Sequence, residues 1–244
     1  MSRSVHLAFT LVMLGTASAL AQSSDPLEPN GSMLWGAIGM QGDLGGGVNS
    51  SGIGLIGTRR AEVDRNTWGE RYDAALVFRI GGAYNLTTHS QLFAAFSWQQ
   101  AEADAAVVGL LGGAPLNGEF SDYQGWGIDA GYRYVFGTTL PFAPFVAGSV
   151  GLDRLQAISL TLSSSGYSAN DIPFYDDSWV SGWRVGTGLL WNIGDRFGAH
   201  VSLDVKYSGV LSDQSGIGTA GFERINNAGN RWTLPLMTGV YVKF

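Results

Sequence analysis

The last thirteen residues of the chain alternate between apolar side chains and polar or small ones. The apolar positions are Trp232, Leu234, Leu236, Val240, Val242 and Phe244, with a break only at Thr238. The positions between them include Thr233, Gly239, Tyr241 and Lys243. A period of two places successive side chains on opposite faces of a strand. The segment therefore predicts a strand with one face toward hydrocarbon and the other toward a wetter environment.

The same alternation recurs along the chain and predicts eight strands. They are Ser32–Gln41, Tyr72–Asn85, Gln91–Ala101, Gly125–Phe136, Phe142–Leu155, Val180–Asn192, Phe197–Val210 and Arg231–Phe244. Three connections are short: Leu86–Ser90, Gly137–Pro141 and Ile193–Arg196. Four are long and rich in Gly, Ser, Asn and Asp: Gly42–Arg71, Glu102–Gln124, Gln156–Trp179 and Leu211–Asn230.

Short and long connections alternate strictly, as they do in an all-β, antiparallel up-and-down transmembrane barrel with both chain ends in the periplasm. Residues Ser51–Thr58 could form one more strand. Nine strands would put the two ends on opposite sides, so we assign this stretch to the first long loop or to an extension of a strand.

Charged residues decide which strand faces point inward. In the strand Phe197–Val210, Asp204 and Lys206 lie opposite the apolar face. A Lys or Arg facing lipid at mid-membrane costs about 2–4 kcal/mol, so the charged faces are expected to line the lumen. A soluble lipocalin-like barrel, the alternative fold, would keep its apolar side chains inside instead.

The inward faces predict a network of four acids and four bases. Its members are Asp73, Arg79, Asp129, Arg133, Asp153, Arg184, Asp204 and Lys206. The interior of an eight-stranded barrel is just wide enough for side chains to fill it. Because an unpaired buried charge is costly, these groups are expected to pair and plug the lumen. An ion-conducting lumen is the alternative.

Aromatic side chains are expected to mark the two membrane interfaces. Trp126 and Phe136 are ten residues apart, and Trp232 and Phe244 are twelve apart. At about 2.5 Å of height per residue in a tilted strand, such spacings span roughly 20–30 Å, close to the ~25 Å apolar band of these barrels. The predicted interface aromatics are Trp126, Tyr134, Phe136, Trp183, Trp191, Trp232 and Phe244.

The amino terminus predicts export. Arg3 and His6 precede an apolar stretch that is too short to cross a bilayer, and Ala19-Leu20-Ala21 follows as a cleavage site. We expect a signal peptide over residues 1–21, a periplasmic lead over 22–31 and the barrel over 32–244. The chain has no cysteine, which excludes disulfides and thiolate metal sites. Its net charge of −6 argues against a nucleic-acid partner.

Two further patterns predict neither cofactor nor metal. The segment Gly52-Ile53-Gly54-Leu55-Ile56-Gly57 spells G-x-G-x-x-G, but a dinucleotide site needs that pattern between a strand and a helix. The acid pairs of the long loops lack the one-three-five ligand spacing of a calcium loop.

One pair of residues suggests catalysis. His200-Val201-Ser202 resembles the His-x-Ser motif of PagL-type lipid A deacylases, which implies a histidine base and a serine nucleophile. The sequence departs from that motif at Leu203, where the family has Asn. Strand parity also places both side chains in the lumen, whereas a lipid substrate arrives from the membrane. We therefore expect no catalytic residues.

The chain as a whole resembles small eight-stranded bacterial outer-membrane barrels of the OmpA/OmpX/OmpW-like and opacity-protein-like porin group. The resemblance rests on the alternation, the hairpin layout and the ending Gly239-Val240-Tyr241-Val242-Lys243-Phe244, since such barrels end in an aromatic residue that the barrel-assembly machinery reads. It implies the outer membrane as location, and membrane lipid, lipopolysaccharide and the assembly machinery as partners.

The resemblance leaves three functions to weigh. The leading one is a non-enzymatic surface protein that presents four long extracellular loops to an unknown partner. The alternatives are a narrow porin-like channel for small solutes and a lipid A-modifying enzyme.

Overall fold

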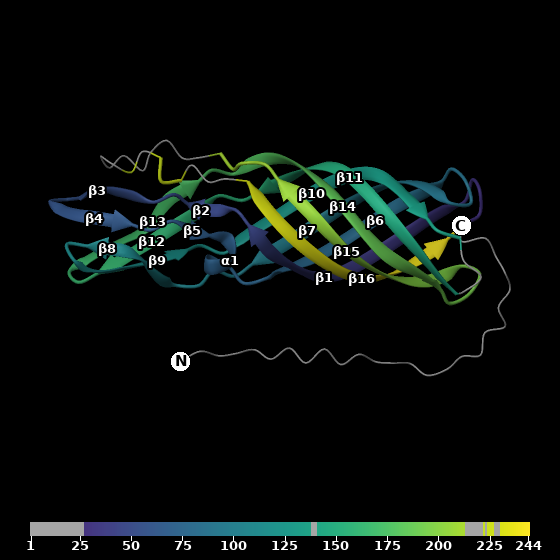
Figure 1. Ribbon diagram of the computed structural model, residues 1–244, viewed down its shortest axis with the longest axis horizontal. Helices are drawn as coiled ribbons and strands as arrows, with labels where there is room; N and C mark the ends of the chain where they lie inside the picture. Colours follow the sequence, from purple (N-terminus) through teal and green to yellow (C-terminus); the bar gives the residue numbers. More distant parts are fainter. Residues whose placement is uncertain (1–26, 138–140, 213–221, 223, 227–229) are drawn as a thin grey trace.

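The computed structural model describes residues 27–137, 141–212, 222, 224–226 and 230–244. The predicted signal peptide, half of the predicted lead, the middle of the second short turn and much of the last long connection lie outside these residues. The described chain forms a barrel and, beyond one end of it, a second sheet along the same long axis (Figure 1). No described helix is long and apolar enough to cross a membrane.

Eight strands close the barrel, each antiparallel to the next in the chain, and the last pairs with the first. They are β1 (Ser32–Gly45), β6 (Ala75–Asn85), β7 (Ser90–Ala101), β10 (Tyr123–Val135), β11 (Phe142–Leu155), β14 (Ser178–Asn192), β15 (Phe197–Ser208) and β16 (Arg231–Lys243). The predicted eight-stranded up-and-down barrel is confirmed. The clearest difference in bounds is in β1, which continues four residues beyond its predicted end.

The barrel is apolar outside and largely polar inside. Ile80, Val150 and Val240 point outward and are 63–69% exposed, whereas Arg79 and Gln91 are buried within. This is the transmembrane arrangement, because such an outer surface would be unfavourable in water. The lipocalin-like alternative, with its apolar side chains inside, is therefore wrong.

Outward aromatic side chains gather near the two ends of the barrel. Near the second sheet, Trp183 and Trp232 lie 5.4 Å apart between ring centroids. Near the other end, Phe142 and Trp191 lie 5.5 Å apart. The remaining predicted aromatics belong to the same two groups, Trp126 to the first and Tyr134, Phe136 and Phe244 to the second. Their contact with membrane interfaces stays a prediction.

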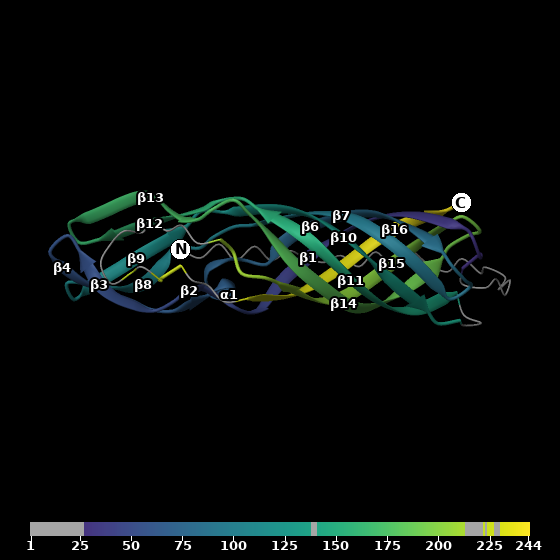
Figure 2. The same cartoon turned by 90° about the horizontal axis from the view of Figure 1, so that it is seen from above.

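Three of the four long connections fold into hairpins that pair with one another. The resulting six-stranded sheet, here called the distal sheet, contains β3 (Gly52–Ile56), β4 (Arg59–Val63), β8 (Ala106–Leu111), β9 (Ala114–Phe120), β12 (Ile158–Ser164) and β13 (Tyr167–Tyr175). Its order is β13-β12-β9-β8-β4-β3, and both views show it extending from one end of the barrel (Figure 2).

The distal sheet corrects the expectation of long loops, because these three connections are regular structure. Residues Ser51–Thr58, which we assigned to a loop or a strand extension, contain β3 and the turn that follows it. A single hairpin is marginally stable in water, whereas six adjacent strands can bury one common apolar face. That face includes Ala61, Leu116 and Phe174, which are at most 1% exposed.

Short elements join the two regions. β2 (Gly47–Asn49) pairs with β5 (Asn66–Thr67), and a single helical turn, α1 (Trp68–Arg71), follows. The backbone N–H and the hydroxyl of Thr67 both donate to the Glu70 carboxylate, at 2.7 and 2.9 Å. These bonds hold the pKa of Glu70 below its usual value. They also fix the turn that carries Trp68 over the mouth of the barrel.

Candidate functional site

Three buried ion pairs lie inside the lumen. Their side chains are only 6–11% exposed. The pairs are Arg79 with Asp129, Arg184 with Asp204 at 3.3 Å, and Lys206 with Asp153 at 2.7 Å. Arg184 and Asp204 lie on the neighbouring strands β14 and β15, whereas the partners of each of the other two pairs are separated by one strand.

Glycines across the sheet leave space for two of these carboxylates. A Cβ atom on Gly186 would lie 1.8 Å from Oδ1 of Asp204, and one on Gly127 would lie 2.2 Å from Oδ1 of Asp153. No side chain fits at either position in this arrangement. The glycine-rich pattern of the inward faces is thus part of how the barrel holds its internal charges.

Arg133 has a different environment from the other internal cations. Its Nη1 atom donates to Oε1 of Gln91 at 3.1 Å, and its guanidinium lies over the rings of Phe145 and Phe93, 4.7 and 5.5 Å from their centroids. Among the described residues no carboxylate lies within ion-pair distance of it. Cation–π contact stabilises such a charge only in part. The lumen therefore carries one more base than acid.

Asp73 is not part of this network, and its predicted place in the lumen is wrong. The residue is exposed and precedes β6, in the segment where Tyr72 forms an isolated bridge with Ala103. Its backbone N–H donates to the carbonyl of Glu102 at 3.0 Å. The strand begins only at Ala75, so the parity used to place Asp73 does not extend that far.

A fourth internal ion pair, missed in the sequence, lies at the distal end of the barrel. Nε and Nη2 of Arg231 donate to the two carboxylate oxygens of Asp43, at 2.6 and 3.0 Å. Asp43 follows the predicted end of the first strand by two residues, on the same face as Gln41. Continuing the alternation to Gly45 would have found it.

Aromatic rings cover the lumen just beyond this pair. The guanidinium of Arg231 lies 4.6 Å from the ring centroid of Trp68 and 4.7 Å from that of Tyr123, and it donates to the Tyr123 hydroxyl. Trp68 also stacks with Tyr72 at 5.4 Å and with Tyr175 at 6.5 Å. We call these four rings the aromatic cover. Burial raises the pKa of Tyr72 well above its usual value.

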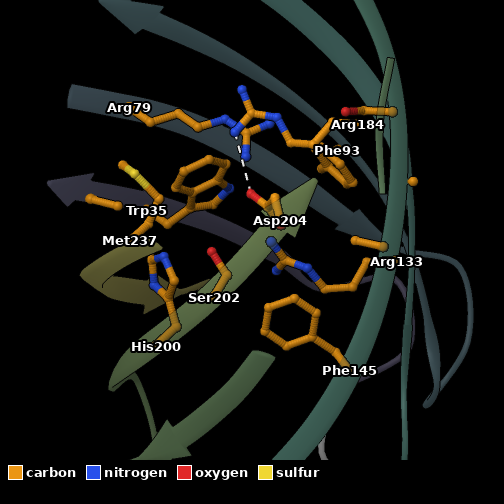
Figure 3. A pocket seen from close by; sticks show the side chains of 14 residues that line it. Trp35, Arg79, Phe93, Arg133, Phe145, Arg184, His200, Ser202, Asp204 and Met237 are labelled. Atoms are coloured by element: carbon orange, nitrogen blue, oxygen red, sulfur yellow. Dashed lines mark hydrogen bonds and ion pairs between the residues drawn. The ribbon is translucent and has the colours of Figure 1, made fainter. Parts of the chain in front are cut away.

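His200 and Ser202 both face the lumen, as strand parity predicts, and are less than a tenth exposed (Figure 3). The His200 ring meets Trp35 edge-on at 5.7 Å. The cavity beside them, also lined by Arg133 and Asp204, has a volume of about 20 Å³. That is room for about one water molecule, not for an acyl chain. The arrangement gives a lipid substrate no access to the pair.

No group of three or more metal-ligating side chains occurs in the described part of the chain. The G-x-G-x-x-G segment is β3 with its turn, in which Gly57 has a φ of 63°, and an antiparallel strand rather than a helix follows it. It lacks the strand–helix context of a dinucleotide site.

No family model and no curated protein matches this chain. Among solved structures, it is similar to Neisserial surface protein A, with 16% identity over 88% of this chain and 97% of that one and a TM-score of 0.44. It is similar to Ail of Yersinia pestis, solved with the heparin analogue sucrose octasulfate, with 12% identity over 89% and 100% and a TM-score of 0.43. It is also similar to OprG of Pseudomonas aeruginosa, with 11% identity over 90% and 98% and a TM-score of 0.46. At such values, the case for a function rests on this chain's own residues.

Proposed function

We propose that this protein is a non-enzymatic, non-conducting barrel of the bacterial outer membrane that presents the distal sheet at the cell surface. The observation that carries the proposal is the filled lumen. Buried ion pairs lie inside it, the aromatic cover lies over its distal end, and the two cavities beside these pairs are about 20 Å³ each. An open pore would need continuous space for hydrated solutes.

The outer surface supports the location. An apolar belt around a closed barrel needs lipid, and outer-membrane barrels combine short periplasmic turns with longer extracellular connections. The turns after β6 and β14 are short, and the distal sheet lies at the other end of the barrel. We therefore assign the distal sheet to the outside, and the start of β1 and the end of β16 to the periplasm, with residues 1–21 as the exported chain's signal peptide.

The carboxyl terminus supports an assembly role for the last strand. Phe244 is 68% exposed, and its backbone N–H donates to the carbonyl of Ser32 at 2.9 Å. An outward aromatic side chain at this end is available to the barrel-assembly machinery, which we propose as one partner, with membrane lipid and lipopolysaccharide as others.

A rigid platform suits surface contact. The six strands of the distal sheet are hydrogen-bonded side by side, and the hydroxyl of the buried Tyr175 joins them to β2 by donating to the carbonyl of Val48 at 2.6 Å. Binding surfaces held on a rigid scaffold lose little conformational freedom when they engage a partner. The proposed activity is thus recognition by exposed strands and turns.

Conductance measurements in planar bilayers test whether the lumen conducts ions. The refolded protein is expected to give no steady ohmic openings, because ion pairs and packed rings occupy the conduction path. A porin of known conductance, measured in the same bilayer, is the positive control. Steady openings whose size changes in Arg133→Ala or Asp129→Ala would establish the channel alternative, and Arg133 would then favour anions.

Lipid A from producing cells tests the enzymatic alternative. Mass spectra of lipid A are expected to be the same for cells with the wild-type protein, with His200→Ala and with an empty vector. The reason is that His200 and Ser202 face the lumen, where lipid does not reach them. A deacylated species present only with the wild type would show that the pair is catalytic.

A further inference from the structure

The distal sheet forms a partly open cavity of about 440 Å³. Side chains from all four long connections line it, among them Val63 of β4, Val108 of β8, Leu162 of β12 and Phe222 of the last connection. These segments are far apart in the sequence and meet only in the folded sheet. The cavity is therefore a feature of the assembled sheet and not of one hairpin.

Most of the side chains that line the cavity are apolar. Of its described residues, Asn49 and Tyr167 alone have polar side-chain atoms. The Asn49 amide is fully used, because its Nδ2 donates to the carbonyls of Ser50 and Asp64 and its Oδ1 accepts from Asn66. A sugar, nucleotide or ion placed here would find few side-chain partners to replace its bonds to water. The lining selects an apolar ligand.

The volume indicates an extended ligand. An engineered apolar cavity of about 150 Å³ holds benzene, and ligand pockets commonly fall between about 300 and 1,000 Å³. An occupant that covers the apolar lining would remove it from water and so stabilise the distal sheet. Branched aliphatic residues such as Ile56, Leu160 and Ile172 dominate the wall, and they suit an alkyl chain.

A cation lies next to one residue of the cavity lining. Arg59 pairs directly across the β3–β4 turn with Ile56, which lines the cavity, so the two side chains project from the same face of the sheet. Nη1 of Arg59 donates to the carbonyl of Ser165 at 2.8 Å, in the turn between β12 and β13. No carboxylate of the described chain lies within ion-pair distance of it, whereas its neighbour Arg60 pairs with Glu62 at 2.9 Å.

We propose that the distal sheet binds an alkyl chain with an anionic head group, the chain in the cavity and the head group beside Arg59. The apolar wall would contact the alkyl chain, and the exposed guanidinium of Arg59 would pair with the anionic head group. A free fatty acid and an acyl chain of a membrane lipid share this chemistry. The proposal does not depend on whether the lumen conducts.

Electron paramagnetic resonance of the full-length protein in lipid nanodiscs tests this site, with nitroxide-labelled stearic acid as the probe. The wild type is expected to show an immobilised component that empty nanodiscs lack. Ala169→Phe, which places a ring in the cavity, is expected to abolish that component. Ser168→Phe, one residue away on the exposed face of β13, is the matched control and is expected to retain it.

A separate variant tests the contact between Arg59 and the anionic head group. Arg59→Gln is expected to weaken binding of the labelled acid by up to about fivefold, as for loss of a partly exposed ion pair. The labelled methyl ester, which has no charge, is expected to bind equally to the wild type and to this variant. Circular dichroism and heat-dependent gel migration check that every variant is folded.

Competition with unlabelled ligands shows whether the bound alkyl chain belongs to a free fatty acid or to a membrane lipid. Displacement of the probe by unlabelled lauric acid supports a free fatty acid, and displacement by added lipopolysaccharide alone supports a membrane lipid. No immobilised component in the wild type, equal immobilisation in the folded Ala169→Phe variant, or displacement by neither competitor would overturn the proposal.

Discussion

Replacing Asp153 with alanine is expected to lower the free energy of unfolding by about 3–5 kcal/mol, because the ammonium of Lys206 would remain buried without its counter-charge. The two groups are 2.7 Å apart and about a tenth exposed. Urea unfolding in lipid vesicles, followed by tryptophan fluorescence and by heat-dependent gel migration, measures the change.

Two controls isolate the unpaired charge as the cause. The double variant Asp153→Leu with Lys206→Met is expected to recover most of the lost stability, since it removes both charges together. Asp177→Ala breaks a pair with Arg154 that is exposed on the outside, and its unfolding midpoint is expected to stay where it is. If the single variant Asp153→Ala is as stable as the wild type, water reaches Lys206 and the lumen is not sealed.

Replacing Val185 with arginine is expected to cost about 2–4 kcal/mol in lipid vesicles, the penalty for a cation on the lipid face near mid-membrane. Val185 is the central residue of β14, 56% exposed, and its pairing partners are Gly148 and Val205. The same urea titration measures the effect, and Val185→Leu controls for the change in size.

A matched position on the distal sheet distinguishes lipid from water. Val107 of β8 is 52% exposed, close to the exposure of Val185. Because we place it outside the membrane, Val107→Arg is expected to change stability by about 0.5 kcal/mol at most. Equal costs at the two positions would contradict the proposed position of the membrane.

The barrel and the distal sheet are two distinct regions of the structure. The barrel supplies an anchor whose interior is occupied by charges that must pair, and the distal sheet supplies surface and a separate apolar cavity. Under the proposed function, sealing would depend on residues of the barrel and recognition on residues of the distal sheet. Asp43 and Arg231, together with the aromatic cover, form the boundary between the regions.

The sequence by itself determined the strands of the barrel and the direction of their side chains. Pleating is local, so a charge in a period-two segment shows its face without knowledge of any partner. Arg79, Asp129 and Lys206 were placed inward on that basis, and the structure buries them or nearly so. Placement by alternation fails only where the predicted strand bounds are wrong. For that reason Asp73 was wrongly placed in the lumen, and Asp43 was left out of it.

Only the tertiary structure decided which charges pair and what the long connections become. Arg79 and Asp129 are fifty residues apart in the chain, and their contact follows from the order and stagger of strands in a closed barrel. The hairpins of the distal sheet are stable together because they share one buried face, and their cavity exists only between them. Alternation along a strand shows which face a side chain is on. Which other side chains it contacts depends on how distant strands are brought into register.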